Sequence, residues 1–268
     1  MRFIIFWIFT GLSSICLGQG LSLRDDILYA YEVKQIDEFL ERFNNEETAI
    51  KKYIRQTEPN AIISRLDMIK SLINRNDSTW NLTLINEFIG HINDQKNPVF
   101  LNFVDPEWYA QVDCSVRYLH KDHKVSLILK IEKGLDESLK WVITMASGEF
   151  LRLPKDSNTL AFLNPVSQGT DFLGLDKALH DKKYIKNYLP AGYKENQLSI
   201  FLNHWKDGTI QLNQVNKITY HFLQIDGYIF KVENFNRKSR NHGWLISSLC
   251  KANTIQKAEY KSEILHMN

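Results

Sequence analysis

Residues 216–250 carry closely spaced large apolar residues in short β-rich runs, and this pattern is the clearest prediction of an antiparallel β-sheet in the chain. Asp226-Gly227 separates two β-rich runs, and a two-residue Asp-Gly loop is typical of a tight hairpin because both of its positions need positive φ. After a polar loop, residues 243–250 predict a third strand beside the second. Both faces of the hairpin carry large apolar groups, so we expect each face to be covered.

The tight turn would also fix the register of the hairpin, and with it the surroundings of His221. It sets His221 opposite Val232 and Leu223 opposite Phe230, on the same face as Tyr228. Burial on this apolar face would perturb the pKa of His221. The favoured interpretation is nevertheless a core histidine whose ring nitrogens are satisfied by neighbouring groups.

Upstream of this sheet the apolar spacing changes to that of helices. Three stretches place apolar side chains at helical intervals, and the expected helices are residues 25–43, 60–73 and 82–92. The apolar stripes of these helices, which include Ile73, Ile85 and Ile89, are expected to face the core. Pro98 and Asp105-Pro106 end this helical region. The spacing then changes to period two, and the strands of the predicted meander are residues 108–118, 125–131 and 139–145.

The second half repeats this order of helices followed by a meander. Gly and Pro residues spread among polar ones after residue 147 predict a link between two units. Helices near residues 170–189 and 198–205 precede the second meander, and the polar C-terminus is expected to be a frayed tail or a short surface helix. The expected division is a first unit 25–146, a linker 147–169, a second unit 170–250 and a tail 251–268.

Together these patterns predict an α+β protein in which helices pack on curved antiparallel sheets, with two similar helix-plus-meander halves. The last two strands of each half also match locally, and Trp141 and Trp244 stand at corresponding positions. We expect both indole rings to lie in the core. An ancient duplication and a chance similarity between amphipathic hairpins both explain the match, and the halves could form one sheet or two.

Helices packed against a curved antiparallel sheet resemble the nuclear transport factor two-like superfamily, which includes ketosteroid isomerases and scytalone dehydratases. The resemblance is architectural and covers roughly residues 36–146 and, more loosely, 170–250. Residues 39–44 and 243–247 also resemble segments of uncharacterised exported bacterial proteins. In the enzymes of the superfamily a cavity between sheet and helices holds carboxylate, His or Tyr groups, but no catalytic set aligns with this chain.

The first 18 residues have the order of a secretory signal peptide: Arg2, an apolar core, and small residues before a cut after Gly18. A membrane anchor would need ~20 apolar residues, so we expect no transmembrane segment after cleavage. Lipidation of Cys16 is the alternative, although Ile15 stands where a lipoprotein signal wants a small residue. The expected location is the periplasm or the outside of the cell.

Composition and motifs narrow the range of partners. The 268 residues include 33 Lys and Arg against 31 Asp and Glu, so binding to nucleic acid is not expected. The sequence contains no phosphate loop, dinucleotide fingerprint, zinc-protease helix or nucleophile elbow, and we expect no cofactor. His120, Asp122 and His123 come nearest to a metal cluster, but they lie on a predicted turn and leave a zinc site short of ligands.

Two cysteines remain after the expected cleavage, and each lies in an apolar alternating run. Cys114 and Cys250 are expected to be buried thiols that pack as small apolar groups. Export to an oxidising compartment leaves a disulfide between them as the alternative. A basic loop could bind an anion, although such loops are usually solvated connections; its residues are Arg237, Lys238, Arg240 and His242.

The favoured function is non-catalytic binding of a small molecule or of an envelope protein, through a sheet cavity or an apolar sheet face that could also form a homodimer. The candidate pocket residues are His221, Tyr228, Phe230, Tyr109 and Asp113. The alternative is a cavity enzyme that performs acid–base isomerisation, dehydration or hydrolysis with His221, Tyr228 and Asp113. Binding is favoured because the sequence places no orienting polar group at strand or helix spacing from His221.

Overall fold

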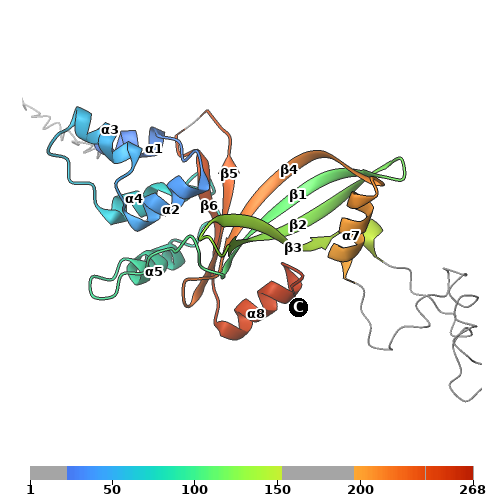
Figure 1. Cartoon of the computed structure of the whole chain (residues 1–268). Coiled ribbons are helices and arrows are strands. Elements are labelled where there is room, and N and C mark those ends of the chain that lie inside the picture. The colour runs from blue at the N-terminus through green and yellow to red at the C-terminus, as the bar shows by residue number, and fades with distance from the viewer. Residues whose placement is uncertain (1–22, 153–195, 239, 268) are drawn as a thin grey trace, which may run out of the picture.

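The computed structural model describes residues 23–152, 196–238 and 240–267. The expected signal peptide, most of the linker and the helix expected near residues 170–189 lie outside this part of the chain. Within it, seven α-helices accompany one six-stranded antiparallel sheet that does not close into a barrel (Figure 1), which confirms the α+β class.

The two predicted meanders join into a single curved sheet (Figure 1). Its strands are β1 Trp108–Tyr118, β2 Lys121–Lys133, β3 Leu139–Ser147, β4 Ile210–Phe222, β5 Tyr228–Phe235 and β6 Gly243–Lys251. The order is β3-β2-β1-β4-β5-β6. Each meander therefore supplies three neighbouring strands, and β1 pairs with β4 to connect them.

Most of the helices lie at one end of this sheet. They are α1 Leu23–Ala30, α2 Ile36–Asn44, α3 Ala49–Thr57, α4 Arg65–Ser71, α5 Leu82–Ile92, α7 Gln197–Lys206 and α8 Thr254–Glu263, with a short 3-10 helix η1 Glu149–Leu151. The predictions near residues 82–92 and 198–205 are confirmed as α5 and α7. The single helix expected over 25–43 is divided into α1 and α2, because Val33 between them forms a parallel bridge with Gly243 of β6.

The helix expected over residues 60–73 starts later than predicted. Ser64 accepts a hydrogen bond from the backbone of Asp67 while the Asp67 side chain accepts one from Ser64, and this capping box sets the start of α4 at Arg65. Helix α3, which Thr48 caps through its side chain, was not predicted from the sequence.

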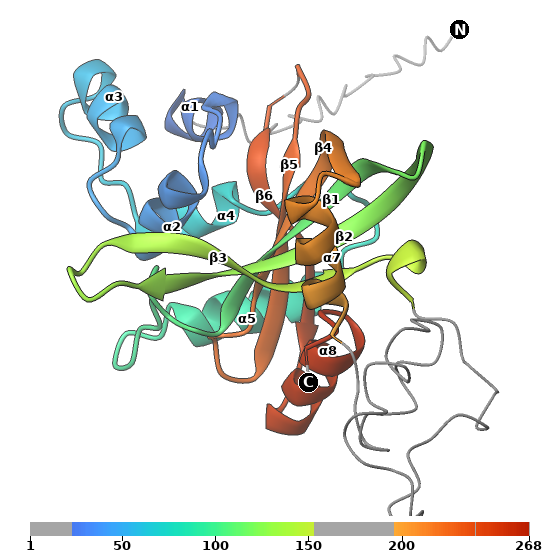
Figure 2. The same cartoon turned by 45° about the vertical axis from the view of Figure 1, so that its right-hand side comes forward.

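One face of the sheet, called face A, holds the main core. Helices α2, α4 and α5 pack on it at one end, over Trp108, Phe222 and Phe230. These three rings stack in sequence, with centroids 5.1 Å and 4.8 Å apart. At the far end of face A, α7 and η1 pack over Val116 and Val125, and Figure 2 shows α7 in front of the strands there.

The opposite face, called face B, is covered in part by the C-terminal segment. An Asn253–Gln256 capping box starts α8, and Leu265 beyond it is buried against Tyr109 and Ile229. The polar C-terminal stretch therefore contains a short helix that closes part of the sheet.

Strand β4 starts earlier than the pattern suggests because it contains two bulges. Its pairing with β1 skips Asn213 and Asn216. Each bulge adds one residue and so returns the next apolar side chain to the same face. Leu212, Val215 and Ile218 consequently share face A, although their spacing of three residues breaks strict alternation.

The β4–β5 register differs from the prediction by one residue. Phe222 pairs with Phe230 and His221 with Lys231. The reason lies in the connection, where Gly227 has a positive φ of 76° and Asp226 does not, so the two residues do not form the tight turn that was expected. Since a shift by one residue moves a side chain to the opposite face, the expectation that His221 shares a face with Phe230 is wrong.

The two tryptophans expected at equivalent core positions are not equivalent. Trp141 of β3 lies opposite Ile131, whereas Trp244 of β6 lies opposite Asn234. On face A, the centroid of the Tyr220 ring lies 6.3 Å from that of Trp141 and 4.9 Å from that of Trp244. Trp141 remains 39% exposed because β3 is an outer strand of the sheet, so the prediction that its ring lies in the core is wrong.

Candidate functional site

The sheet divides the five predicted pocket residues. Tyr228 and Phe230 lie on face A, in the core under α5, whereas His221, Tyr109 and Asp113 lie on face B. The ring of Phe88 in α5 fills the space over the first pair, 5.1 Å from Tyr228 and 5.7 Å from Phe230. The structure therefore does not bring the five side chains into one cavity.

His221 is sealed beneath α8, with 1% of its surface exposed. Its Nδ1 lies 2.7 Å from the Tyr260 hydroxyl and its Nε2 lies 3.1 Å from Gln111 Oε1. Gln111 in turn donates to Asp113 at 3.0 Å. Burial, with a further contribution from Lys231, lowers the pKa of His221 to about 3. The ring is thus neutral with both nitrogens occupied, as expected for the core histidine that the sequence favoured.

Cys114 and Cys250 are free thiols. Cys114 lies on β1 and Cys250 on β6, with β4 and β5 between them. Since neighbouring strands are ~4.8 Å apart, the separation exceeds the ~7 Å limit between the Cα atoms of a disulfide, and the disulfide alternative is wrong. Cys114 is buried as expected, but Cys250 is exposed because β6 is an outer strand.

The histidines of the β1–β2 turn have other roles. Asp122 forms an ion pair with Arg117 at 3.2 Å, and the His123 ring packs against Phe150 with centroids 4.8 Å apart. His120 adopts a left-handed backbone with φ of 64° at the turn. Among the residues that the structure describes, no group of three His, Cys, Asp or Glu side chains could hold a metal ion.

The basic loop before β6 contributes to the architecture. Arg237 donates to Asn241 O at 2.9 Å and to Asn74 Oδ1 at 2.8 Å. Its guanidinium also lies 5.0 Å from the centroid of the Phe235 ring. Arg237 therefore binds the chain between α4 and α5, which forms the wall of the hollow described next.

A hollow of about 460 Å³ lies between α4, α5 and their connection, and we call it the helical pocket. The apolar spacing of the sequence did not predict this pocket. Its residues are Ile73, Ile85, Ile89, Trp80 and Leu82, which are apolar, and Lys70, Arg75, Asp77, Ser78 and Asn86, which are polar. The first three belonged to the predicted core stripes, so the sequence indicated the apolar floor but not the opening above it.

Hydrogen bonds from distant residues shape the wall of the helical pocket. Asn241 accepts from the backbone of Arg75 at 2.8 Å, across 166 residues of sequence, and donates to Ser71 O at 3.0 Å. Trp80 Nε1 donates to Asn74 O at 2.6 Å, which fixes the indole. The connection is therefore held in place without a ligand, as in most small-molecule sites.

The polar residues of the helical pocket have a positive balance. Asp77 accepts from the hydroxyl and the backbone of Thr79, which lowers the pKa of Asp77. The guanidinium of Arg75 lies 4.1 Å from the centroid of the Tyr29 ring, a contact that orients the cation and leaves its charge in place. Lys70 adds the second positive charge. Positive charge beside an apolar floor favours a ligand with an apolar body and an anionic head.

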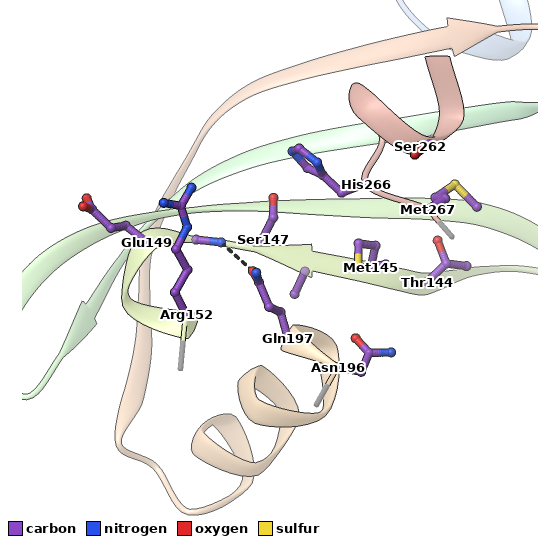
Figure 3. A pocket seen from close by; sticks show the side chains of 12 residues that line it. Thr144, Met145, Ser147, Glu149, Arg152, Asn196, Gln197, Ser262, His266 and Met267 are labelled. Carbon is purple, nitrogen blue, oxygen red and sulfur yellow. Dashed lines mark hydrogen bonds between the residues drawn. The ribbon is translucent and has the colours of Figure 1, made fainter. Parts of the chain in front are cut away.

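A larger hollow of about 830 Å³ lies beside the end of β3 (Figure 3). Arg152, Gln197 and His266 line it, and Gln197 Oε1 accepts from the backbone of Gly148 at 3.3 Å. Arg152 and Asn196 adjoin residues 153–195, which lie outside the described chain. We assign this hollow no role for that reason.

No family model, curated protein or solved structure matches this chain. Of the features that the superfamily resemblance implies, the structure shows the α+β architecture with a six-stranded antiparallel sheet. Within the described ranges, no helix is long and apolar enough to cross a membrane.

Proposed function

We propose that this protein is a non-catalytic binding protein that holds a small amphiphilic molecule in the helical pocket. The apolar body would lie on Ile73, Ile85 and Ile89, and the anionic head would face Lys70 and Arg75. The observation that supports the proposal is the apolar floor beside two cations in a hollow of about 460 Å³, a size within the ~300–1,000 Å³ of small-molecule sites.

The same geometry gives little support to acid–base catalysis. Catalysis of that kind needs a base or nucleophile oriented by a second group. The described lining of the helical pocket contains neither His nor Cys, and its carboxylate, Asp77, is occupied by Thr79. His221, the base of the enzymatic alternative, is enclosed on the opposite side of the sheet from Tyr228.

Titration of the purified chain with decanoate, octanoate and decanol tests both halves of the proposed ligand. Each buried CH₂ contributes ~0.8 kcal/mol, so decanoate should bind more tightly than octanoate. Decanol should bind more weakly than decanoate because it lacks the charge. Equal affinities for decanol and decanoate would show that the pocket does not recognise an anionic head. If none of the three compounds binds, the proposed function is wrong.

Fluorescence quenching by a brominated decanoate locates the ligand. Bromine beside the indole should quench Trp80, so Trp80→Phe should remove a quenched component. The matched control is Trp205→Phe, because Trp205 is an exposed tryptophan on α7 outside the pocket lining. Lys70→Met and Arg75→Met should weaken decanoate binding without affecting decanol. Quenching that survives in Trp80→Phe would place the ligand elsewhere.

We also propose that the chain is exported to the periplasm or the outside of the cell. The proposal is supported by the order of charged, apolar and small residues over positions 1–18. Intact-mass measurement of the mature protein should show cleavage near Gly18. Retention of Met1, or a lipid on Cys16, would contradict it.

A further inference from the structure

Strand β4 has a long edge that faces no strand in the described chain. Its residues 219–222 pair with β5, whereas residues 210–218 pair with β1 on one side and with no described strand on the other. Figure 1 shows β4 arching away from β5 and β6 over this length. Free backbone N–H and C=O groups along an edge are a template for another strand.

The outer edge of β6 shows how this fold closes an edge. The backbone of Trp244 donates to Val33 O at 2.9 Å, and that of Ile246 donates to Leu72 O at 2.8 Å. Two parallel bridges, to Val33 and Ile73, accompany these hydrogen bonds. No corresponding bridge covers residues 210–218 within the described ranges.

The side chains of this edge are apolar on face A. Leu212 and Val215 are 46% and 48% exposed, although the two bulges align them with the core row. Beside them lies a hollow of about 300 Å³, lined by three apolar and three polar residues: Val215, Ile218 and Trp244, with Asn216, Lys217 and Asn234. An exposed aliphatic row next to a free strand edge is typical of an interaction surface.

We propose that a second copy of this chain covers the edge, with the two β4 strands pairing antiparallel across a two-fold axis. This arrangement sets the Leu212 and Val215 row of each copy against the same row of the other on face A. Between residues 211 and 217 the one charged side chain is Lys217, and its Nζ lies 2.8 Å from Glu233 Oε1 of its own chain. Two copies therefore meet without opposing unpaired charges.

The bulged residues leave the edge accessible. Asn213 donates to Asp122 at 3.1 Å and Asn216 donates to the Ser115 hydroxyl at 2.8 Å, so both side chains are held by the β1–β2 hairpin of their own chain. The second copy would consequently meet the backbone and the aliphatic row. It would also cover the hollow beside Trp244.

Light scattering across a concentration series tests the proposal. The purified wild-type chain should have twice the monomer mass, with a Kd at or below about 10 µM. Leu212→Lys and Val215→Lys should be monomers, because each sets like charges together across the axis. The matched control is Leu202→Lys, since Leu202 is 47% exposed on α7, and it should remain a dimer. A monomeric wild type, or dimers in both edge variants, would overturn the proposal.

A cross-link keeps the test independent of folding defects in the lysine variants. Gln214 lies in the middle of the edge, so Gln214→Cys in a Cys250→Ser background should form a covalent dimer on mild oxidation. Leu202→Cys in the same background should not. Failure of Gln214→Cys to cross-link while the wild type is dimeric would show that the dimer uses another surface. Decanoate binding, measured in the same variants, reports on the helical pocket separately.

Discussion

The two ends of the sheet are closed in different ways. At the end under α2, α4 and α5, which we call the helical end, aromatic rings fill face A and backbone bonds from Val33 and Leu72 close the edge of β6. At the far end, α7 packs on face A, but residues 210–218 of β4 pair on one side only within the described part of the chain, and Leu212 is exposed. Because buried contacts decide local stability, we expect the helical end to hold the fold and the far end to accept a partner.

The two ends also differ in the burial of their arginine ion pairs. Arg42, fully buried at the helical end, donates to Glu32 O and Glu38 at 2.8 Å each. Arg117 on β1 lies half-exposed beside Asp122. Removing one partner of a buried pair leaves an uncompensated charge, whereas an exposed pair contributes little. Loss of the buried ion pair at the helical end should therefore destabilise the fold more than loss of the exposed pair at the far end.

The largest expected effect is at Trp108. Its ring is fully buried at the helical end, so Trp108→Ala should lower the free energy of unfolding by about 3–5 kcal/mol. Trp141→Ala should cost clearly less, because that ring, 5.2 Å away, is part-exposed. Urea denaturation of both variants measures the difference. Equal losses of unfolding free energy in the two variants would contradict the prediction that the exposed ring contributes less.

The next effect concerns the closed edge of β6. Gly243 has φ of 88°, and an added Cβ would collide with the backbone of Val33. Gly243→Ala should therefore cost about 2–4 kcal/mol, from backbone strain and from loss of the bridge. The matched control is Gly227→Ala, since Gly227 has φ of 76° but open space around it, and the cost there should be about 1 kcal/mol. Similar costs at both sites would mean that the bridge contributes nothing.

A smaller, pH-dependent effect comes from His221. Its pKa is about 3 in the folded chain against ~6.5 when unfolded. The neutral ring therefore stabilises the fold fully above pH ~6.5, and this contribution falls as the pH drops towards 3, by at most ~1.4 kcal/mol per pH unit. Between pH 7 and pH 4, the free energy of unfolding should change less with pH for His221→Gln than for the wild type. Denaturation of both chains at a series of pH values measures this slope.

The sequence predicted the elements of the sheet better than their register. Period-two alternation is a local property of a strand, so β1 and the α+β class followed from it. The bulges at Asn213 and Asn216 depend on pairing with β1, and the turn at Asp226 depends on a backbone angle that Asp and Gly do not fix. Neither the bulges nor the turn geometry can be predicted from apolar spacing. The resulting one-residue error in the β4–β5 register placed His221 on the wrong face of the sheet.

The candidate site was harder to predict than the fold. Ile73, Ile85 and Ile89 were assigned to the core from helical spacing, and they do form an apolar floor. The pocket above them exists because Asn241, far away in sequence, holds the connection at Arg75. Such a contact is set by tertiary structure, and no pattern within the connection itself reports it.

The smallest effect is expected at the far end, where Arg117 and Asp122 form an ion pair at 3.2 Å. Both side chains are more than half exposed, so water screens the attraction, and Asp122 keeps a second partner in Asn213. Arg117→Ala should therefore change the free energy of unfolding by less than about 1 kcal/mol, and by less still in high salt. Denaturation of this variant at low and high salt is the measurement. A loss above about 2 kcal/mol would show that the far end stabilises the fold as strongly as a buried pair, and the contrast with Arg42 would then fail.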